Sequence, residues 1–267
     1  TYAVTLVQNG SDKIGGSTDN SILDVEGIAV TLVFVDATQG WLVTDSGLQS
    51  EAPPPQYITA TGGTITCCGD YKIHTFTGPG TFTVSNAGNP AGSNTVDYLV
   101  VAGGGGSGGD LSGGGGAGGY RFSNGTASGC YAAGPSPLGA SALPVPVQGY
   151  PITVGSGGAV GSSPNISQGN PGANSVFSTI TSTGGGGGLV RSEHTTSPSV
   201  GPGGSGGGAS YNQGCFGTGN TPPVTPPQGN PGSPAPGSSD ASGGGGGGAG
   251  GAGVSIPPAG SPRDGIV

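Results

Sequence analysis

The chain has 267 residues, of which 64 are glycine and 24 are proline, while only 7% are charged. Glycine does not recur at every third position throughout, which excludes collagen, and a hydrophobic fraction of 31% argues against one large apolar core. The formal net charge is −8 with only five Lys and Arg, which argues against a nucleic-acid partner because nucleic-acid binding requires a basic surface.

Residues 1–50 are expected to form a small β unit that serves as a shaft or attachment module. Short apolar or alternating segments predict strands at Ala3–Val7, Ile22–Val25, Ala29–Val35 and Trp41–Thr44. Four strands of this length bury little apolar surface on their own. We therefore expect a homotrimer, in which neighbouring copies cover part of Ile28, Val30, Leu32 and Phe34.

Residues 51–56 read EAPPPQ and predict a semi-rigid linker, because prolines favour the extended polyproline II conformation. Residues 57–102 predict a second β region, which includes YITATGGTITCC, YKIHTFTGPGTFTV and VDYLVVA. In KIHTFT the alternation predicts that His74 and Phe76 share one face of a strand, and that His74 packs in the sheet.

Residues 103–267 are expected to form a glycine-rich domain without significant helix. Its glycine tracts lie at 103–109, 113–119, 184–188, 203–208 and 243–253. A phosphate-binding loop is disfavoured because no helix is predicted after the first tract and no Gly-Lys-Ser/Thr occurs. A flexible linker is the second interpretation. We favour the third, which is packed polyglycine II helices with three residues per turn, since only glycine lets backbones approach so closely.

The segments between the tracts, at 120–150, 189–202 and 209–242, are expected to form long exposed loops. QGNPGAN at 168–174 and QGNPGSP at 228–234 are predicted to be turns, with Asn-Pro-Gly at the bend. Of the four cysteines, Cys130 and Cys215 could pair, whereas the adjacent Cys67 and Cys68 cannot form an ordinary bridge to each other. No C-x-x-C motif occurs, so no metal and no cofactor are expected.

An ordered series of motifs resembles a known family. TATGGTIT, GDYKIHTFTGPGTFTV, VDYLVVAGGGGSGG, GGGGAGGYRF, YPITVGSGG and NSVFSTITSTGGGGG follow one another over about residues 57–253. The series is similar to the glycine-rich domain of tailed-phage tail fibres and adhesins, many of them from cyanophages. That resemblance implies a polyglycine sandwich whose surface loops bind a host lipopolysaccharide or an outer-membrane protein. It also implies a location in the virion, exposed to the extracellular medium, with other tail or baseplate proteins as partners.

The aromatic and amide groups of the loops are the candidates for receptor binding. Aromatic rings can stack on sugars, and the polar side chains can hydrogen-bond hydroxyl groups; the candidates are Tyr131, Arg191, His194, Tyr211, Asn212, Gln213 and Phe216. Each of these residues could instead pack only its own loop. Repetition over identical subunits would strengthen weak single-site binding through avidity.

An enzyme is not expected, because the acidic residues of the glycine-rich part show no paired spacing of the kind that glycoside hydrolysis requires. No stretch is long and apolar enough to predict a membrane span. The alternative function is a purely structural virion component, such as a fibre spacer or a capsid decoration protein. The position of the loops, at a free tip or buried against another virion protein, would separate the two functions.

Overall fold

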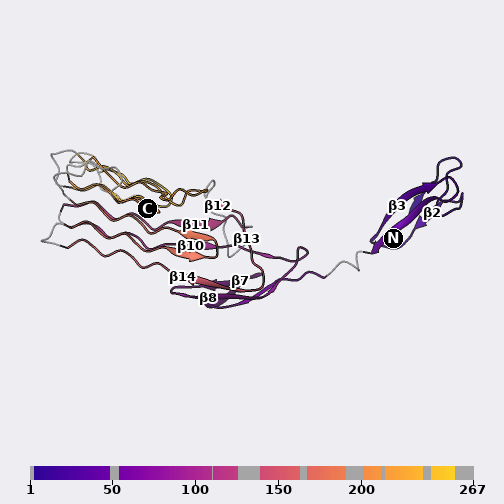
Figure 1. The fold of residues 1–267 in the computed structure, drawn as a ribbon, viewed down its shortest axis with the longest axis horizontal. Helices are drawn as coiled ribbons and strands as arrows, with labels where there is room; N and C mark the ends of the chain where they lie inside the picture. Colours follow the sequence, from indigo (N-terminus) through magenta and orange to yellow (C-terminus); the bar gives the residue numbers. More distant parts are fainter. Residues whose placement is uncertain are drawn as a thin grey trace. The chain divides into compact units, whose positions relative to one another are not determined.

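The computed structural model describes residues 3–48, 54–109, 111–125, 139–162, 167–190, 201–211, 214–236 and 242–255. Over these ranges the chain forms strands and extended segments without helix, which confirms the all-β class (Figure 1). The described ranges accordingly contain no helix capable of crossing a membrane. The chain divides into two compact units, one of residues 1–56 with 89–92 and the other of residues 57–88 with 93–267.

The first unit consists of two antiparallel hairpins. β1 (Val4–Leu6) pairs with β2 (Ser21–Leu23), and β3 (Ile28–Asp36) pairs with β4 (Gly40–Leu48). Strands were expected in these parts of the sequence, and the structure confirms them. None of the described hydrophobic side chains of residues 3–48 is buried, so this unit has no core of its own.

A five-stranded antiparallel sheet is the framework of the second unit. Its strands lie in the order β16 (Ile180–Ser182), β15 (Ser175–Phe177), β14 (Gly149–Thr153), β8 (Gly80–Ala87) and β5 (Ile58–Thr61). The sheet thus joins segments from both sides of residue 102, where the sequence led us to expect a boundary between two domains. Strand pairing joins residues that are distant in sequence, so the local composition does not predict which strands pair.

Smaller pairings complete the β part of the second unit. These are β6 (Thr64–Cys68) with β7 (Tyr71–Thr75), β9 (Thr95–Val96) with β13 (Leu143–Pro144), and the sheet of β10 (Leu99–Val101), β11 (Tyr120–Ser123) and β12 (Gly139–Ala140).

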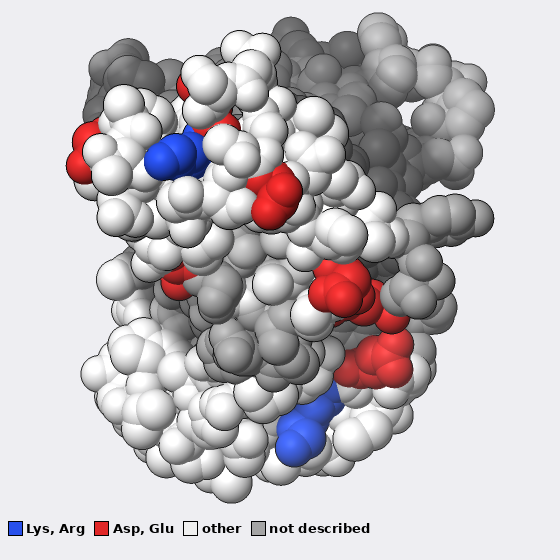
Figure 2. Space-filling model, turned by 90° about the vertical axis from the view of Figure 1, so that its right-hand side faces the viewer, with Lys and Arg blue, Asp and Glu red and all other residues white. Residues whose placement is uncertain are grey.

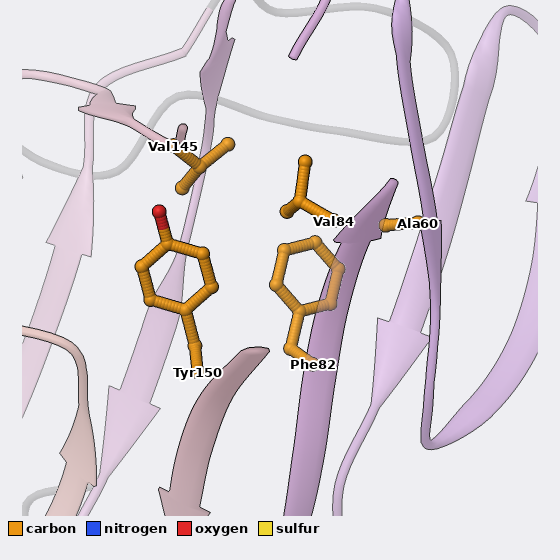
Figure 3. Close-up of a cluster of buried hydrophobic side chains, with 5 residues drawn as sticks. All are labelled: Ala60, Phe82, Val84, Val145 and Tyr150. Carbon is orange, nitrogen blue, oxygen red and sulfur yellow. The ribbon is translucent and has the colours of Figure 1, made fainter. Parts of the chain in front are cut away.

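The apolar core of the second unit is small and lies against the five-stranded sheet. Ala60, Phe82, Val84, Val145 and Tyr150 form its buried centre (Figure 3). Tyr150 and Val145 approach from one side of Phe82 and Val84, and Ala60 lies on the other. Alternating apolar residues of short strands therefore supply a core that the low hydrophobic fraction still allows.

His74 and Phe76 lie toward this core, as the alternation in KIHTFT predicts. The His74 ring packs edge-on against Phe82 with ring centroids 5.0 Å apart, and its Nδ1 lies 2.8 Å from the carbonyl oxygen of Gly62. Ile73, on the opposite face, is exposed. The packing prediction for His74 is confirmed.

Extended glycine-rich threads run side by side away from the sheets (Figure 1). We call this assembly the glycine array; its described threads are residues 102–109, 111–119, 155–162, 167–174, 183–190, 203–211, 214–220, 228–236 and 242–248.

Hydrogen bonds between threads recur at every third residue. The N–H groups of Gly103, Gly106 and Gly109 donate to carbonyl oxygens of the thread 167–174 at 2.9–3.0 Å. A three-residue repeat is that of the polyproline II helix, whose own backbone makes no internal hydrogen bonds. The prediction that the glycine tracts pack laterally as extended threads is confirmed for 103–109, 113–119, 184–188 and 203–208, and for 243–253 up to residue 248, after which the chain bends at 249–251.

The two QGNPG segments are threads of the array, and the prediction that they form turns is wrong. In the first, the N–H groups of Gly169 and Gly172 donate to Gly188 and Gly185. In the second, Gly232 donates to Gly217. The physical reason lies in the spacing: glycine recurs at every third position, where another thread approaches, and proline has the φ that this helix requires.

The cysteines do not pair as the sequence allowed. Cys215 is a free thiol, so it forms no bridge with Cys130, which lies outside the described residues. Cys68 takes part in a disulfide, while its neighbour Cys67 is free and exposed. The location of two cysteines in irregular segments thus does not predict a disulfide between them, because disulfide formation depends on the distance between their Cβ atoms in the fold.

Candidate functional site

The glycine array determines which backbone positions can carry a side chain. In the thread 102–109 a Cβ on Gly103, Gly105 or Gly106 would collide with a carbonyl group of a neighbouring thread. A Cβ on Gly104 would meet nothing closer than 3.7 Å, and Ser107, three residues further on, is exposed. Of the three sides of this thread, one therefore faces solvent.

The next thread follows the same rule. Gly115, Gly116 and Gly118 each face the backbone of a neighbour, whereas Ala117 is exposed. Ala117 lies three residues after Gly114, where a Cβ would lie 3.3 Å from the nearest atom. In these two threads Ser107 and Ala117, the residues that interrupt the glycine runs, thus occupy the outward register of the helix.

The central threads leave no such side free. Every residue from Gly184 to Gly188 would place a Cβ against another backbone. In the thread 203–211, Ser205 and Ser210 are fully buried, and their hydroxyl groups have no hydrogen-bond partner in the part of the chain that the structure describes. The interior of the array therefore consists mainly of backbone atoms. Side chains that could contact a ligand are confined to the outer threads and to the ends of the array.

We define the distal end of the array as the end at which residues 109, 111, 162, 167, 190, 211, 214, 236 and 242 lie. Inter-thread hydrogen bonds bring these thread ends together: Gly109 donates to Ser167 and Tyr211 donates to Leu111. The opposite end joins the sheets, where Ala102 continues β10 and Gly119 precedes β11. Nine described thread ends therefore lie at one end of the array, away from the sheets, while residues 221–227 connect two threads at the opposite end.

Gln228 anchors the array near the sheets. Its side chain is buried, its Oε1 accepts a hydrogen bond from Thr183 N at 2.8 Å, and its Nε2 donates to Thr183 Oγ1 and to the Pro222 carbonyl. Its backbone carbonyl accepts from Tyr120 N, at the start of β11. The side chain and the backbone of Gln228 together thus connect it to three other segments, at Thr183, Pro222 and Tyr120.

A second polar group lies where the array joins the β10–β11 sheet. Ser123 Oγ accepts a hydrogen bond from Tyr98 N at 2.9 Å and donates to Asp97 Oδ1 at 2.7 Å. Burial raises the pKa of the Tyr98 hydroxyl, and the positive charge of Arg121 partly offsets this effect. These groups stabilise the junction between the array and the β10–β11 sheet.

Two of the seven candidate receptor-binding residues lie in the described part of the distal end. Tyr211 ends the thread 203–211 and is half-buried. Phe216, also half-buried, lies on the adjacent thread 214–220, whose Gly217 donates to Gly207. The other candidates, Tyr131, Arg191, His194, Asn212 and Gln213, lie outside the described residues.

Sequence reasoning did not select the apolar residues of the distal end. Leu111 adopts a φ of +48° beside Tyr211, and Leu189 is buried. The signal that could have identified them is their position: Leu189 directly follows the glycine run 184–188, and Leu111 lies between the runs 103–109 and 113–119.

The described residues of the array carry no charged side chain. Charged groups are few elsewhere too, and on the face drawn in Figure 2 acidic side chains are scattered among uncharged ones. Among the described residues, no group of three or more His, Cys, Asp or Glu is placed to hold a metal ion. The described distal surface can therefore act through stacking, apolar contact and neutral hydrogen bonds.

A family model described as a glycine-rich domain matches residues 75–265. The matched range begins at the last residue of β7 and includes every thread of the array. No curated protein and no solved structure matches the chain.

Proposed function

The chain belongs to the glycine-rich domain family, and from this premise we propose that it is a tail-fibre protein of a tailed phage, with a cyanophage as the expected source. In this proposal the glycine array is a rigid stalk, and its distal end recognises a receptor on the host cell during adsorption. The observation that carries the proposal is the gathering of thread ends, with Tyr211 and Phe216, at one end of the array.

The dense hydrogen bonding of the array supports a role in presenting a binding surface. Its threads are held by backbone hydrogen bonds to neighbours that are distant in sequence, such as Gly186 to Ser205 and Ala117 to Gly247. Loops carried by a rigid framework are where binding residues concentrate in proteins. A framework that does not flex reduces the entropy lost when such loops bind.

The chemistry of the array indicates the class of receptor. The described threads carry no charged side chain, so they gain little from a strongly anionic ligand and favour one that offers hydroxyl groups and apolar ring faces. A neutral surface glycan fits this description, and so does an uncharged loop of an outer-membrane protein. Several copies of one weak site on a fibre would bind by avidity.

Binding to intact cells tests the proposal directly. The full chain would be labelled with a fluorophore and measured by flow cytometry on a panel of cyanobacterial and other Gram-negative strains. We expect binding to a subset of strains. Simultaneous replacement of Arg191, His194, Tyr211 and Phe216 by Ala should reduce that binding about tenfold or more, while the protein still folds and unfolds in a cooperative thermal transition.

A matched control separates receptor recognition from general adhesion. Four exposed residues of the β part, Tyr57, Ile65, Lys72 and Val147, would be replaced by Ala, and binding should stay at the wild-type level. If no strain binds the wild-type chain, or if the distal variant binds as well as the wild type, the chain is better described as a structural virion component.

A further inference from the structure

Four threads of the glycine array follow one another across one outer side, which we call the open face. Their order is 155–162, 102–109, 111–119 and 242–248, because backbone hydrogen bonds connect each thread to the next. We call the line along which two of these threads meet a seam, and number the three seams in the same order. The described chain leaves this side uncovered, as the exposure of five residues shows: Gly104, Ser107, Ala117, Gly157 and Val160.

The threads of the open face retain rows of N–H groups without a partner. A helix with three residues per turn directs every third residue to the same side. In the thread 102–109 two such rows donate to neighbouring threads, while the third row, Gly104 and Ser107, donates to no group of the described chain. In the next thread the row without a partner among the described residues is Gly115 and Gly118. The open face therefore offers backbone donors three residues apart.

The second seam also has acceptors. The carbonyl oxygens of Gly105 and Gly108 accept no hydrogen bond from the part of the chain that the structure describes. The Gly105 oxygen lies at this seam, since a Cβ on Gly115 of the adjoining thread would be 2.1 Å from it. Donors and acceptors three residues apart are the pattern by which threads inside the array bind one another. The backbone at the second seam therefore matches that of a further extended thread.

Two other threads lack the corresponding N–H groups because they contain proline. In 167–174 four N–H groups donate to neighbours, and the unused row contains Pro171. In 228–236 the unused row contains Pro231 and Pro234. Proline has no N–H, and its use on an exposed edge discourages pairing with another chain. The described threads of the open face contain no proline, so their protection must come from another feature.

Ser107 is a side chain placed at the second seam. A Cβ on Gly104 would lie 3.7 Å from the Gly116 oxygen of the adjoining thread, and Ser107 is the next residue in the same row. Inside the array, a Cβ on Gly105 would lie only 2.1 Å from the Gly186 oxygen. A backbone seated on the second seam at the spacing of the interior would therefore collide with Ser107.

The other two seams each carry one such side chain. A Cβ on Gly157 would lie 3.7 Å from the adjoining thread 102–109, and Val160 follows three residues later, at the first seam. A Cβ on Gly114 would lie 3.3 Å from the thread on its other side, and Ala117 follows three residues later, at the third seam. Both side chains are exposed. Each seam thus has one glycine that leaves it open and one side chain that obstructs it.

The occupant that fits an unobstructed seam is a thread of a second copy of this chain. Such an occupant must be extended, without side chains at the seam, and able to hydrogen-bond at every third residue, and the glycine threads meet all three conditions. The described residues of the array carry no charged side chain, so two open faces would not repel each other electrostatically. We propose that Ser107, Ala117 and Val160 are blocking side chains, one at each seam, which prevent the open faces of two copies from joining.

Removal of the three side chains tests the proposal on the full chain. The variant that combines Ser107→Gly, Ala117→Gly and Val160→Gly, which we call the bare variant, should form species larger than those of the wild type at the same protein concentration. The excess should grow as the concentration rises. Sedimentation velocity measures both effects. Equal sedimentation of the bare variant and the wild type at every concentration would overturn the proposal.

A matched control removes the same three types of side chain outside the array. Ala91, Ser141 and Val147 are exposed, and their simultaneous replacement by Gly should leave sedimentation at the wild-type behaviour. Larger species in this control would overturn the proposal, because the loss of any exposed side chains would then be sufficient.

A second variant relocates the blocking side chains by one turn. Gly104→Ser, Gly114→Ala and Gly157→Val, added to the bare variant, place a side chain at each seam again and should restore the sedimentation of the wild type. Persistence of the larger species would contradict the proposal. Thermal unfolding checks that each variant is folded. If the bare variant is unfolded, the single variant Val160→Gly takes its place, and wild-type sedimentation of that variant would likewise overturn the proposal.

Discussion

At the scale of single residues, the array is governed by the absence of a Cβ. Inner glycines are held in place because the space that a side chain would need contains the backbone of the next thread. An exposed glycine in an outer thread, such as Gly104, has no such constraint. Two glycines in similar runs can therefore respond in opposite ways to the same substitution.

We expect Gly186→Ala to destabilise the protein and Gly104→Ala to be tolerated. A Cβ on Gly186 would collide with the Gly201 carbonyl, and overpacking of this kind costs about 1–3 kcal/mol or more. The nearest atom to a Cβ on Gly104 is 3.7 Å away, and an alanine there gains about 0.4–1 kcal/mol from reduced freedom of the unfolded chain. Urea unfolding of both variants measures the difference. Gly115→Val should likewise prevent folding, since its Cβ would collide with Gly105.

Gln228→Glu should make stability depend on pH. The introduced carboxyl would be buried next to the Pro222 carbonyl, which now accepts a hydrogen bond at 3.1 Å and would repel a carboxylate. Burial raises the pKa of a carboxyl group in the folded state, so the folded protein binds more protons than the unfolded one and loses stability as pH rises.

Thermal unfolding of this variant and of Gln228→Ala, compared at pH 4 and pH 8, measures the effect. The glutamate variant should melt lower at pH 8 than at pH 4, relative to the wild type. The alanine variant has no titrating group and should show equal losses at the two pH values.

At the scale of elements, each thread of the array repeats every three residues. In the thread 155–162, Gly155, Gly158 and Gly161 face a neighbour, and Val160 lies outward. This spacing lets a thread on the outside of the array carry serine, alanine, asparagine or proline at two positions in three. The QGNPG segments are threads for this reason.

Insertions into the thread 155–162 should therefore depend on their length. One extra glycine after Gly158 moves Val160 into the position now held by Gly161, where a Cβ would meet the Ser167 carbonyl. Three extra glycines keep the triplet register. We expect the single insertion to lower the melting temperature more than the triple one. Equal losses would mean that the register of this thread does not matter.

At the scale of the whole molecule, two units of different character share one chain. The second unit contains the buried cores and the array, and its stabilising contacts are internal to it. The first unit contains exposed apolar strands and most of the acidic residues of the described chain. The buried hydrophobic residues of the described chain thus lie in the second unit alone.

A protease site inserted between Ser50 and Glu51 tests this separation. After cleavage, the fragment from residue 51 onward should unfold at the same temperature as the intact chain, because it keeps its cores and thread hydrogen bonds. Differential scanning calorimetry measures the transition, and an uncleaved sample of the same protein is the control. A large drop would show that the second unit depends on the first.

The sequence by itself determined the local conformations of this protein. Alternating apolar residues indicated β3 and β4, and glycine runs with outward Ser107 and Ala117 indicated the threads, because allowed backbone angles and side-chain volume are properties of each residue. Only the tertiary structure decided which threads are neighbours, that β14 to β16 complete the sheet of β5 and β8, and that Tyr211 lies beside Leu111. These features depend on hydrogen bonds between backbone groups that are alike in every residue but proline, so the amino-acid types do not encode the choice of partner.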